Sequence, residues 1–199
     1  HAVTMQNHTN YNKDNYPDDE RVRVVSHPVG LKPSTVGALE DFATGIRDAD
    51  AMLGKLTEYF SQVDEPVILV FWGDHYARDS SADPRLHQTT LLMWSNYSQQ
   101  PVDLGTIAAY DISPVMMDIY GLDEPLYFQF LNRQLRVADR AYTRGVVMEQ
   151  DGSTTLEPTE FQQRWNQEHW LLQYDLMFGK GYALDRMGLS AFSAPPKGK

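Results

Sequence analysis

The chain has 199 residues, with 17 Lys or Arg against 27 Asp or Glu, so its formal net charge is -10, and 42% of its residues are hydrophobic. Its length and hydrophobic content predict one domain or part of one, and its acidity excludes nucleic acid as a main partner, because Lys and Arg hold a phosphate backbone. Cysteine is absent, which excludes disulfides and thiolate metal sites, and the longest apolar run, Val67–Trp72, is far shorter than the roughly 20 residues of a membrane span.

The first segments of the chain carry short strand patterns. Ala2–Met5 is rich in β-prone residues and predicts a strand. A chain that opens inside such an element, with His1 rather than Met, indicates a piece of a longer protein. Arg21–Val25 alternates between basic and apolar residues, which favours an edge strand or an extended loop.

A long amphipathic helix is predicted from Pro33 to about Gln62. Ser34–Thr35 supplies good N-cap residues. Gly45 and Gly54 each weaken the helix by up to about 1 kcal/mol relative to alanine, so packing must hold it. Apolar residues recur on one face at steps of three and four: Leu39, Phe42, Ile46, Ala49, Leu53, Leu56 and Phe60.

Two compact apolar segments predict buried strands. Val67–Trp72 has six apolar residues without alternation, which is typical of a central strand covered on both faces. Thr90–Trp94 is a second segment of this kind. Because strands and helices alternate along the chain, we expect an α/β layered fold with a mostly parallel sheet.

The second half of the chain predicts three helices and a hairpin. Proline residues mark the helix starts and glycine residues mark two of the ends. The expected elements are a helix with Ser113 as N-cap and Pro114 as first residue, closed by Gly121; a helix after Pro125 that reaches Tyr142; a hairpin over 145–155; and a helix after Pro158 that Gly179 ends.

Asp74 and His75 are the strongest candidates for a functional site. They follow directly after Val67–Trp72, and ligands of open α/β sheets bind outside the carboxyl ends of the strands. Gly73 lets the backbone turn tightly there. A carboxylate beside an imidazole suits a divalent cation such as zinc or manganese. The alternative is a hydrogen-bonded Asp–His pair that caps the following loop.

The remaining candidate side chains are weaker. His8 follows the first predicted strand and is either a functional residue or a surface histidine. We expect three histidines to be structural or exposed and four aromatic residues to lie in the core rather than to bind sugars. The histidines are His27, His87 and His169, and the aromatic residues are Tyr127, Phe130, Trp165 and Trp170. The sequence contains no Gly-x-Ser-x-Gly, phosphate-loop or His-Glu-x-x-His motif.

Five segments, in this order, resemble one known family. They are Val3–Tyr11, Phe71–Tyr76, Thr90–Trp94, Asp111–Gly121 and Leu171–Tyr182. Together they resemble the extracellular catalytic domain of lipoteichoic acid synthases and related phosphoglycerol transferases, in the sulfatase branch of the alkaline phosphatase superfamily. The resemblance covers about residues 1–182.

The resemblance implies an alkaline-phosphatase-like fold, with residues 1–189 as the C-terminal part of a catalytic domain and 190–199 as a flexible tail. Asp74 and His75 match the family's metal ligands for a single divalent ion, usually manganese. His8 matches the histidine that contacts the phosphoryl group or lipid headgroup. The family's threonine nucleophile and glutamate ligand lie upstream of the His8 motif, so we expect the chain alone to be inactive and to need the N-terminal half of its own domain.

The same resemblance implies a parent enzyme anchored by transmembrane helices at the extracellular face of the cell membrane. That enzyme would transfer a glycerol-phosphate group from a glycerophospholipid donor to a cell-envelope polymer. Two alternatives remain open: a sulfatase or phosphodiesterase that uses water as acceptor, and a binding module that has lost the chemistry.

Overall fold

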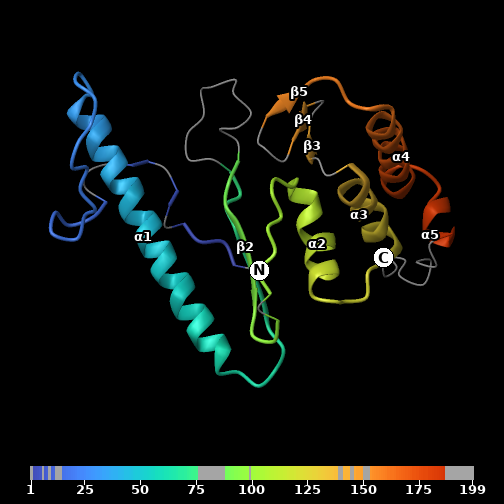
Figure 1. Ribbon diagram of the computed structural model, residues 1–199, viewed down its shortest axis with the longest axis horizontal. Helices are drawn as coiled ribbons and strands as arrows, with labels where there is room; N and C mark the ends of the chain where they lie inside the picture. The colour runs from blue at the N-terminus through green and yellow to red at the C-terminus, as the bar shows by residue number, and fades with distance from the viewer. Residues whose placement is uncertain are drawn as a thin grey trace, which may run out of the picture. The chain divides into compact units, whose positions relative to one another are not determined.

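The chain divides into two compact units, His1–Gln100 and Pro101–Lys199, which we describe separately (Figure 1). The computed structural model describes residues 2–5, 7–8, 10–11, 15–75, 88–98, 100–138, 141–143, 146–149 and 153–186. The predicted tail over 190–199 therefore lies outside the described residues.

The described residues of unit 1 include one long helix and a two-stranded ribbon. Helix α1 spans Pro33–Ser61, as predicted, and strands β1 (Ile68–Trp72) and β2 (Leu91–Ser95) lie where the two apolar segments predicted strands. The predicted burial of β1 on both faces is wrong for the described residues, because β1 pairs only with β2 there and its side chains are half-buried or exposed. The strands pair antiparallel, with Val70 opposite Met93. Every strand pair in the described part of the chain is antiparallel, so the mostly parallel sheet is not found there.

The start of α1 differs from the prediction in its cap. Lys32 is the N-cap, and its carbonyl oxygen accepts hydrogen bonds from the amides of Thr35 and Val36 at 2.9 and 3.1 Å. Because Pro33 takes the first helical position with its fixed φ, Ser34 and Thr35 lie inside the first turn instead of capping it.

The segment Arg21–Val25 is extended but is not a strand, because side chains of α1 take its amide donors. Thr44 Oγ1 accepts a hydrogen bond from the Val22 amide at 3.0 Å, and Glu40 Oε1 accepts one from the Val24 amide at 3.1 Å. The extended-loop alternative is therefore correct. Ala2–Met5 is not a strand either, and its apolar side chains are exposed.

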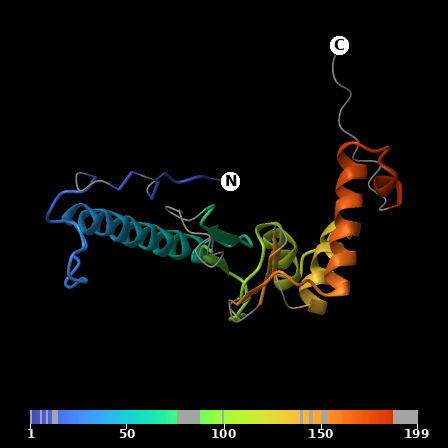
Figure 2. The same ribbon diagram turned by 90° about the horizontal axis from the view of Figure 1, so that it is seen from above.

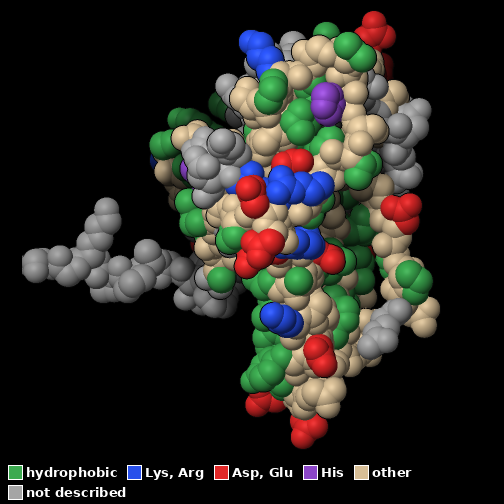
Figure 3. All heavy atoms as spheres, turned by 90° about the vertical axis from the view of Figure 1, so that its left-hand side faces the viewer, with side chains coloured by type: hydrophobic (Ala, Val, Ile, Leu, Met, Phe, Trp, Pro, Cys, Tyr) green, Lys and Arg blue, Asp and Glu red, His purple; other side chains and the backbone are tan. Residues whose placement is uncertain are grey.

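Ion pairs hold the same segment on α1. The guanidinium of Arg21 lies 3.5 Å from the buried carboxylate of Asp41, and that of Arg23 lies 3.1 Å from Glu40. Figure 3 shows basic and acidic side chains intermixed on this side of unit 1. Because each buried charge has a partner of opposite sign, burial of these polar groups is tolerated.

One asparagine ties α1 to the ribbon. The side-chain nitrogen of Asn96, Nδ2, lies 3.2, 3.0 and 2.9 Å from the backbone carbonyl oxygens of Phe60, Val63 and Glu65. Its Oδ1 atom accepts a hydrogen bond from the Val67 amide at 2.8 Å. This single side chain thus fixes the loop between α1 and β1 beside the end of β2.

Unit 2 contains helices and a small antiparallel sheet. A 3-10 turn, η2 (Ala109–Asp111), leads into α2 (Ile112–Ile119). The other elements are α3 (Leu126–Ala138), β3 (Ala141–Thr143), β4 (Val146–Met148), β5 (Thr154–Thr155), α4 (Glu160–Met177) and α5 (Tyr182–Arg186), and the strand order is β3-β4-β5.

Two predicted boundaries in unit 2 are wrong. The 3-10 turn starts the α2 region one turn early, so Asp111 rather than Ser113 occupies the N-cap position. The helix after Pro125 ends at Ala138, and Tyr142 belongs to β3. The closure at Gly121 is confirmed by its φ of 66°, which favours glycine.

Helix α4 confirms the predicted last long helix and shows how it begins. Thr159 Oγ1 accepts a hydrogen bond from the Gln162 amide at 3.2 Å, and Gln162 Oε1 accepts one from the Thr159 amide at 2.8 Å. This reciprocal capping box satisfies two amide donors at the helix start. The short helix α5 that follows was not predicted.

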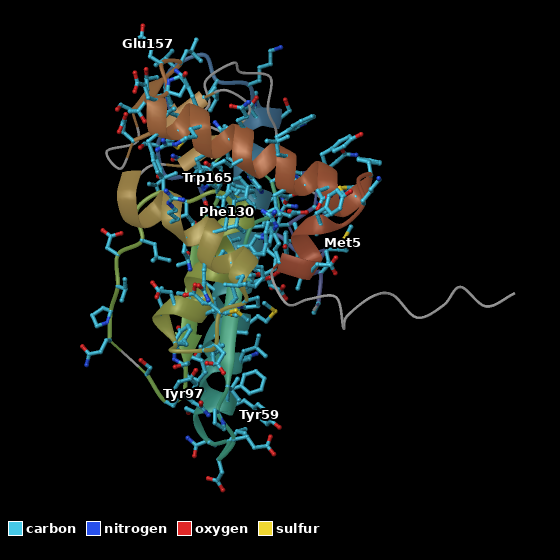
Figure 4. The ribbon with its side chains drawn as sticks, turned by 90° about the vertical axis from the view of Figure 1, so that its right-hand side faces the viewer. Met5, Tyr59, Tyr97, Phe130, Glu157 and Trp165 are labelled. Atoms are coloured by element: carbon cyan, nitrogen blue, oxygen red, sulfur yellow. The ribbon has the colours of Figure 1, made fainter. Side chains whose placement is uncertain are left out.

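An aromatic cluster forms the core of unit 2. Trp165 of α4 is 2% exposed, and its ring stacks on Phe130 of α3 at 5.5 Å (Figure 4). The ring centroids of His169 and Trp165 lie 4.7 Å apart, which confirms the structural role of His169. Trp170, which we expected in the core, is 59% exposed and stacks on Tyr174, because it lies on the opposite face of α4 from Trp165.

Asp111 is a buried carboxyl group in the same unit. Its residue is 1% exposed, and its Oδ2 atom has no hydrogen-bond partner among the described residues. Burial raises the pKa of Asp111 to about 7. The nearby Tyr127 hydroxyl lies 3.0 Å from His169 Nε2, and burial raises the pKa of Tyr127 and lowers that of His169.

The raised pKa of Asp111 predicts a pH-dependent stability. The ordinary pKa of this carboxyl group is 3.8, so it ionises at a much lower pH in the unfolded chain than in the folded one. Its stabilising contribution is complete below about pH 4 and is lost as pH rises to about 7, by up to about 4 kcal/mol. We expect Asp111→Asn to flatten this fall in the free energy of unfolding between pH 4.5 and 8, measured by urea denaturation.

Two comparisons make that measurement specific. His169 has the opposite effect on the pH dependence, because its lowered pKa reduces the free energy of unfolding as pH falls below about 6.5. The unchanged chain and Asp111→Asn both retain His169, so its effect is the same in the two proteins. Asp123→Asn alters an exposed carboxylate of unit 2 and is the control. Equal pH slopes for Asp111→Asn and the unchanged chain would contradict the prediction.

Candidate metal centre

The end of β1 is closed by a tight contact with the start of β2. The Gly73 amide donates a hydrogen bond to the Thr90 carbonyl oxygen at 3.2 Å, and Thr89 Oγ1 donates one to the Gly73 carbonyl oxygen at 2.6 Å. A Cβ atom on Gly73 would lie 3.0 Å from the Cβ of Thr89. Glycine therefore allows Thr89 to approach and clamp the backbone immediately before Asp74.

Asp74 and His75 project from this clamped end. Their side chains are 74% and 65% exposed. Asp74 Oδ1 accepts a hydrogen bond from the His75 amide at 2.9 Å, and Asp74 Oδ2 lies 3.6 Å from His75 Nε2. One carboxylate oxygen thus fixes the local turn, while the other oxygen and the imidazole lie close together at the surface.

This arrangement fits two of the ligands of a divalent cation. A carboxylate oxygen and an imidazole nitrogen are both common ligands of zinc and manganese. Catalytic sites commonly have at least three protein ligands, and in the described part of the chain no group of three His, Asp or Glu side chains could hold an ion. Any further ligand would have to come from outside the described residues.

His8 lies on the N-terminal segment that runs beside α1 (Figure 2). Its side chain is exposed, and its amide donates a hydrogen bond to the Met5 carbonyl oxygen at 3.1 Å. Within the described residues it does not form a three-ligand cluster with Asp74 and His75. The structure thus brings the two predicted ligands together and leaves His8 as a separate candidate.

The other predicted histidines behave in different ways. His27 is exposed, and its Nδ1 atom lies 3.0 Å from the Pro28 carbonyl oxygen. His87 lies outside the described residues. Thr89, which clamps the site, was not singled out from the sequence. The available signal was a glycine directly after an apolar run, which permits a close neighbour but does not identify it.

No helix in the described ranges is long and apolar enough to span a membrane. Residues 1–122 match the family model described as Sulfatase. A curated relative, the putative cyclic beta-1,2-glucan modification protein of Rhizobium meliloti (strain 1021), is 25% identical over an alignment of 215 residues that covers 93% of this chain and 32% of the relative.

A solved structure is similar in fold. It is the Streptococcus pyogenes phosphoglycerol transferase GacH in complex with sn-glycerol-1-phosphate, with a TM-score of 0.63 and 19% identity. The match covers 80% of this chain and 40% of the solved chain. The present chain thus spans about a third of the curated relative and two fifths of the solved transferase.

Proposed function

Because the chain belongs to the sulfatase family, we propose that it is part of a metal-dependent phosphoglycerol transferase that uses a glycerophospholipid donor. The placement of Asp74 and His75 carries this proposal. They lie side by side and exposed after β1, behind the Gly73–Thr89 clamp. The fold similarity to a phosphoglycerol transferase supports the choice of transferred group.

Each candidate residue then has a distinct role. Asp74 Oδ2 and the imidazole of His75 would hold one divalent ion, for which we propose manganese. Such an ion, when bound, stabilises negative charge that develops on a phosphoryl group. His8 would orient a phosphate oxygen or protonate the leaving oxygen, a role that suits an exposed imidazole, which can both donate and accept a proton.

The proposed reaction exchanges one phosphoester bond for another. The bond between phosphorus and the diacylglycerol oxygen breaks, a bond to an acceptor hydroxyl oxygen forms, and the acceptor proton passes to the leaving oxygen. We propose a saccharide hydroxyl of a cell-envelope polymer as acceptor, which the name of the glucan-modifying relative supports. We also propose that the parent protein is anchored at the extracellular face of the membrane.

The test uses the full-length protein with manganese and phosphatidylglycerol labelled in its headgroup glycerol. With an oligomeric β-glucan present, we expect the labelled glycerol to become attached to the saccharide through a phosphodiester. The label on the saccharide reports the transfer, and phosphorus NMR identifies the phosphodiester. Release of glycerol phosphate to water alone would identify a hydrolase, and no release at all would identify a binding module. We expect the 199-residue chain by itself to give no turnover, because Asp74 and His75 supply only two ligands.

A further inference from the structure

A glycine of α1 forms a seat for the N-terminal segment. Gly45 is buried, and the side-chain Oδ1 atom of Asn7 occupies the place that a Cβ atom on Gly45 would take. The hydroxyl of Tyr16 lies 3.1 Å from the same point. Glycine is unfavourable inside a helix, but at Gly45 its missing Cβ atom leaves the space that Asn7 occupies.

The main chain of Asn7 is held by a hydrogen bond. The Tyr11 hydroxyl donates a hydrogen bond to the Asn7 carbonyl oxygen at 2.6 Å. The Tyr11 ring in turn packs edge-on against Phe42 of α1, with ring centroids 5.3 Å apart. Gly45 and Phe42 lie three residues apart on α1, so both contacts involve the same helix face.

The residue that follows this double anchor is His8. The peptide group between Asn7 and His8 includes the carbonyl oxygen that accepts the Tyr11 hydrogen bond. Its amide, that of His8, donates a hydrogen bond to the Met5 carbonyl oxygen. The peptide group that precedes the imidazole is therefore held at both its carbonyl oxygen and its amide, while the imidazole itself is exposed. Fixing a backbone beside an exposed side chain is an effective way to place a reactive group.

We propose that Gly45 is a positioning residue for His8, acting through the seat that it provides for Asn7. The part that concerns the phosphoryl group rests on the proposed function, but the placement of His8 does not. The helix offers a matched control in Gly54, because a Cβ atom there would meet no described atom within 4 Å. Gly45→Ala and Gly54→Ala therefore make the same chemical change in one helix, and only the first displaces Asn7.

The experiment follows His8 by NMR in the 199-residue chain, with its imidazole signal assigned by His8→Gln. We expect Gly45→Ala to shift the imidazole signal of His8 and to speed exchange of its amide proton at least about tenfold, as expected when a local hydrogen bond opens. Gly54→Ala should leave both unchanged. Asn7→Ala, which leaves the helix intact, should change His8 in the same way as Gly45→Ala.

A double variant separates this role from a general effect on α1. If Gly45 acts through Asn7, adding Gly45→Ala to Asn7→Ala should produce little further change in the His8 signals. Equal His8 signals in Gly45→Ala and Gly54→Ala would overturn the proposal, as would an unchanged His8 in Asn7→Ala. If Gly45→Ala changes the His8 signals but the full-length Gly45→Ala protein has normal turnover, Gly45 does position His8. The role proposed for His8 in the reaction would then be wrong.

Discussion

Asp74→Ala in the full-length protein is expected to lower metal-dependent turnover by well over 100-fold. Even residues that only support metal ligands cost about 10- to 100-fold when they are replaced, and Asp74 is proposed to be a ligand itself. Because its side chain is 74% exposed and contacts the neighbouring His75, the fold should tolerate the change. His75→Ala should have a similar effect.

The control for this prediction is Asp64→Ala, which removes an exposed carboxylate of the same unit from the loop before β1. Its turnover should stay near that of the unchanged protein. The measurement is the initial rate of headgroup transfer at several manganese concentrations. Turnover in Asp74→Ala that equals turnover in Asp64→Ala would remove Asp74 from the site.

His8→Ala is expected to lower turnover by about 100-fold while leaving metal content unchanged, which is the scale of a lost general acid or phosphoryl contact. The physical basis is that His8 lies on the N-terminal segment and does not join Asp74 and His75 in a metal-binding group within the described residues. His27→Ala, which changes another exposed histidine of unit 1, is the control. Near-normal turnover, or loss of metal in His8→Ala, would contradict this role.

Local sequence patterns predicted most helices and the two strands of unit 1. The three-and-four spacing of apolar residues located α1 to within one residue at its C-terminal end, and the apolar run located β1. The direction of strand pairing was not predictable in this way, because an apolar run reports burial and not the identity of its neighbour. β1 pairs antiparallel with β2, although its composition favoured a parallel sheet.

Errors elsewhere have the same long-range origin. The alternating pattern of Arg21–Val25 did not reveal that Glu40 and Thr44 would bind its amides in place of a neighbouring strand. The sequence near Trp170 did not show which side of α4 would face Phe130. The family resemblance was more reliable, and the sulfatase family and its alkaline-phosphatase-like fold are confirmed.

The candidate site was predictable as a residue pair but not as a geometry. Gly73, Asp74 and His75 were evident because a glycine and two metal-binding side chains follow the apolar run Val67–Trp72. The Thr89 hydroxyl that holds the turn is 16 residues away, and local spacing contains no information about such a contact. The same applies to the seat of Asn7 on Gly45.

The most direct test of the central claim is manganese binding to the full-length protein, followed by the loss of the free Mn²⁺ signal in electron paramagnetic resonance. We expect one bound ion in the unchanged protein and in Asp64→Ala, and strongly weakened binding in both Asp74→Ala and His75→Ala. Undiminished manganese binding in both of these variants would contradict it.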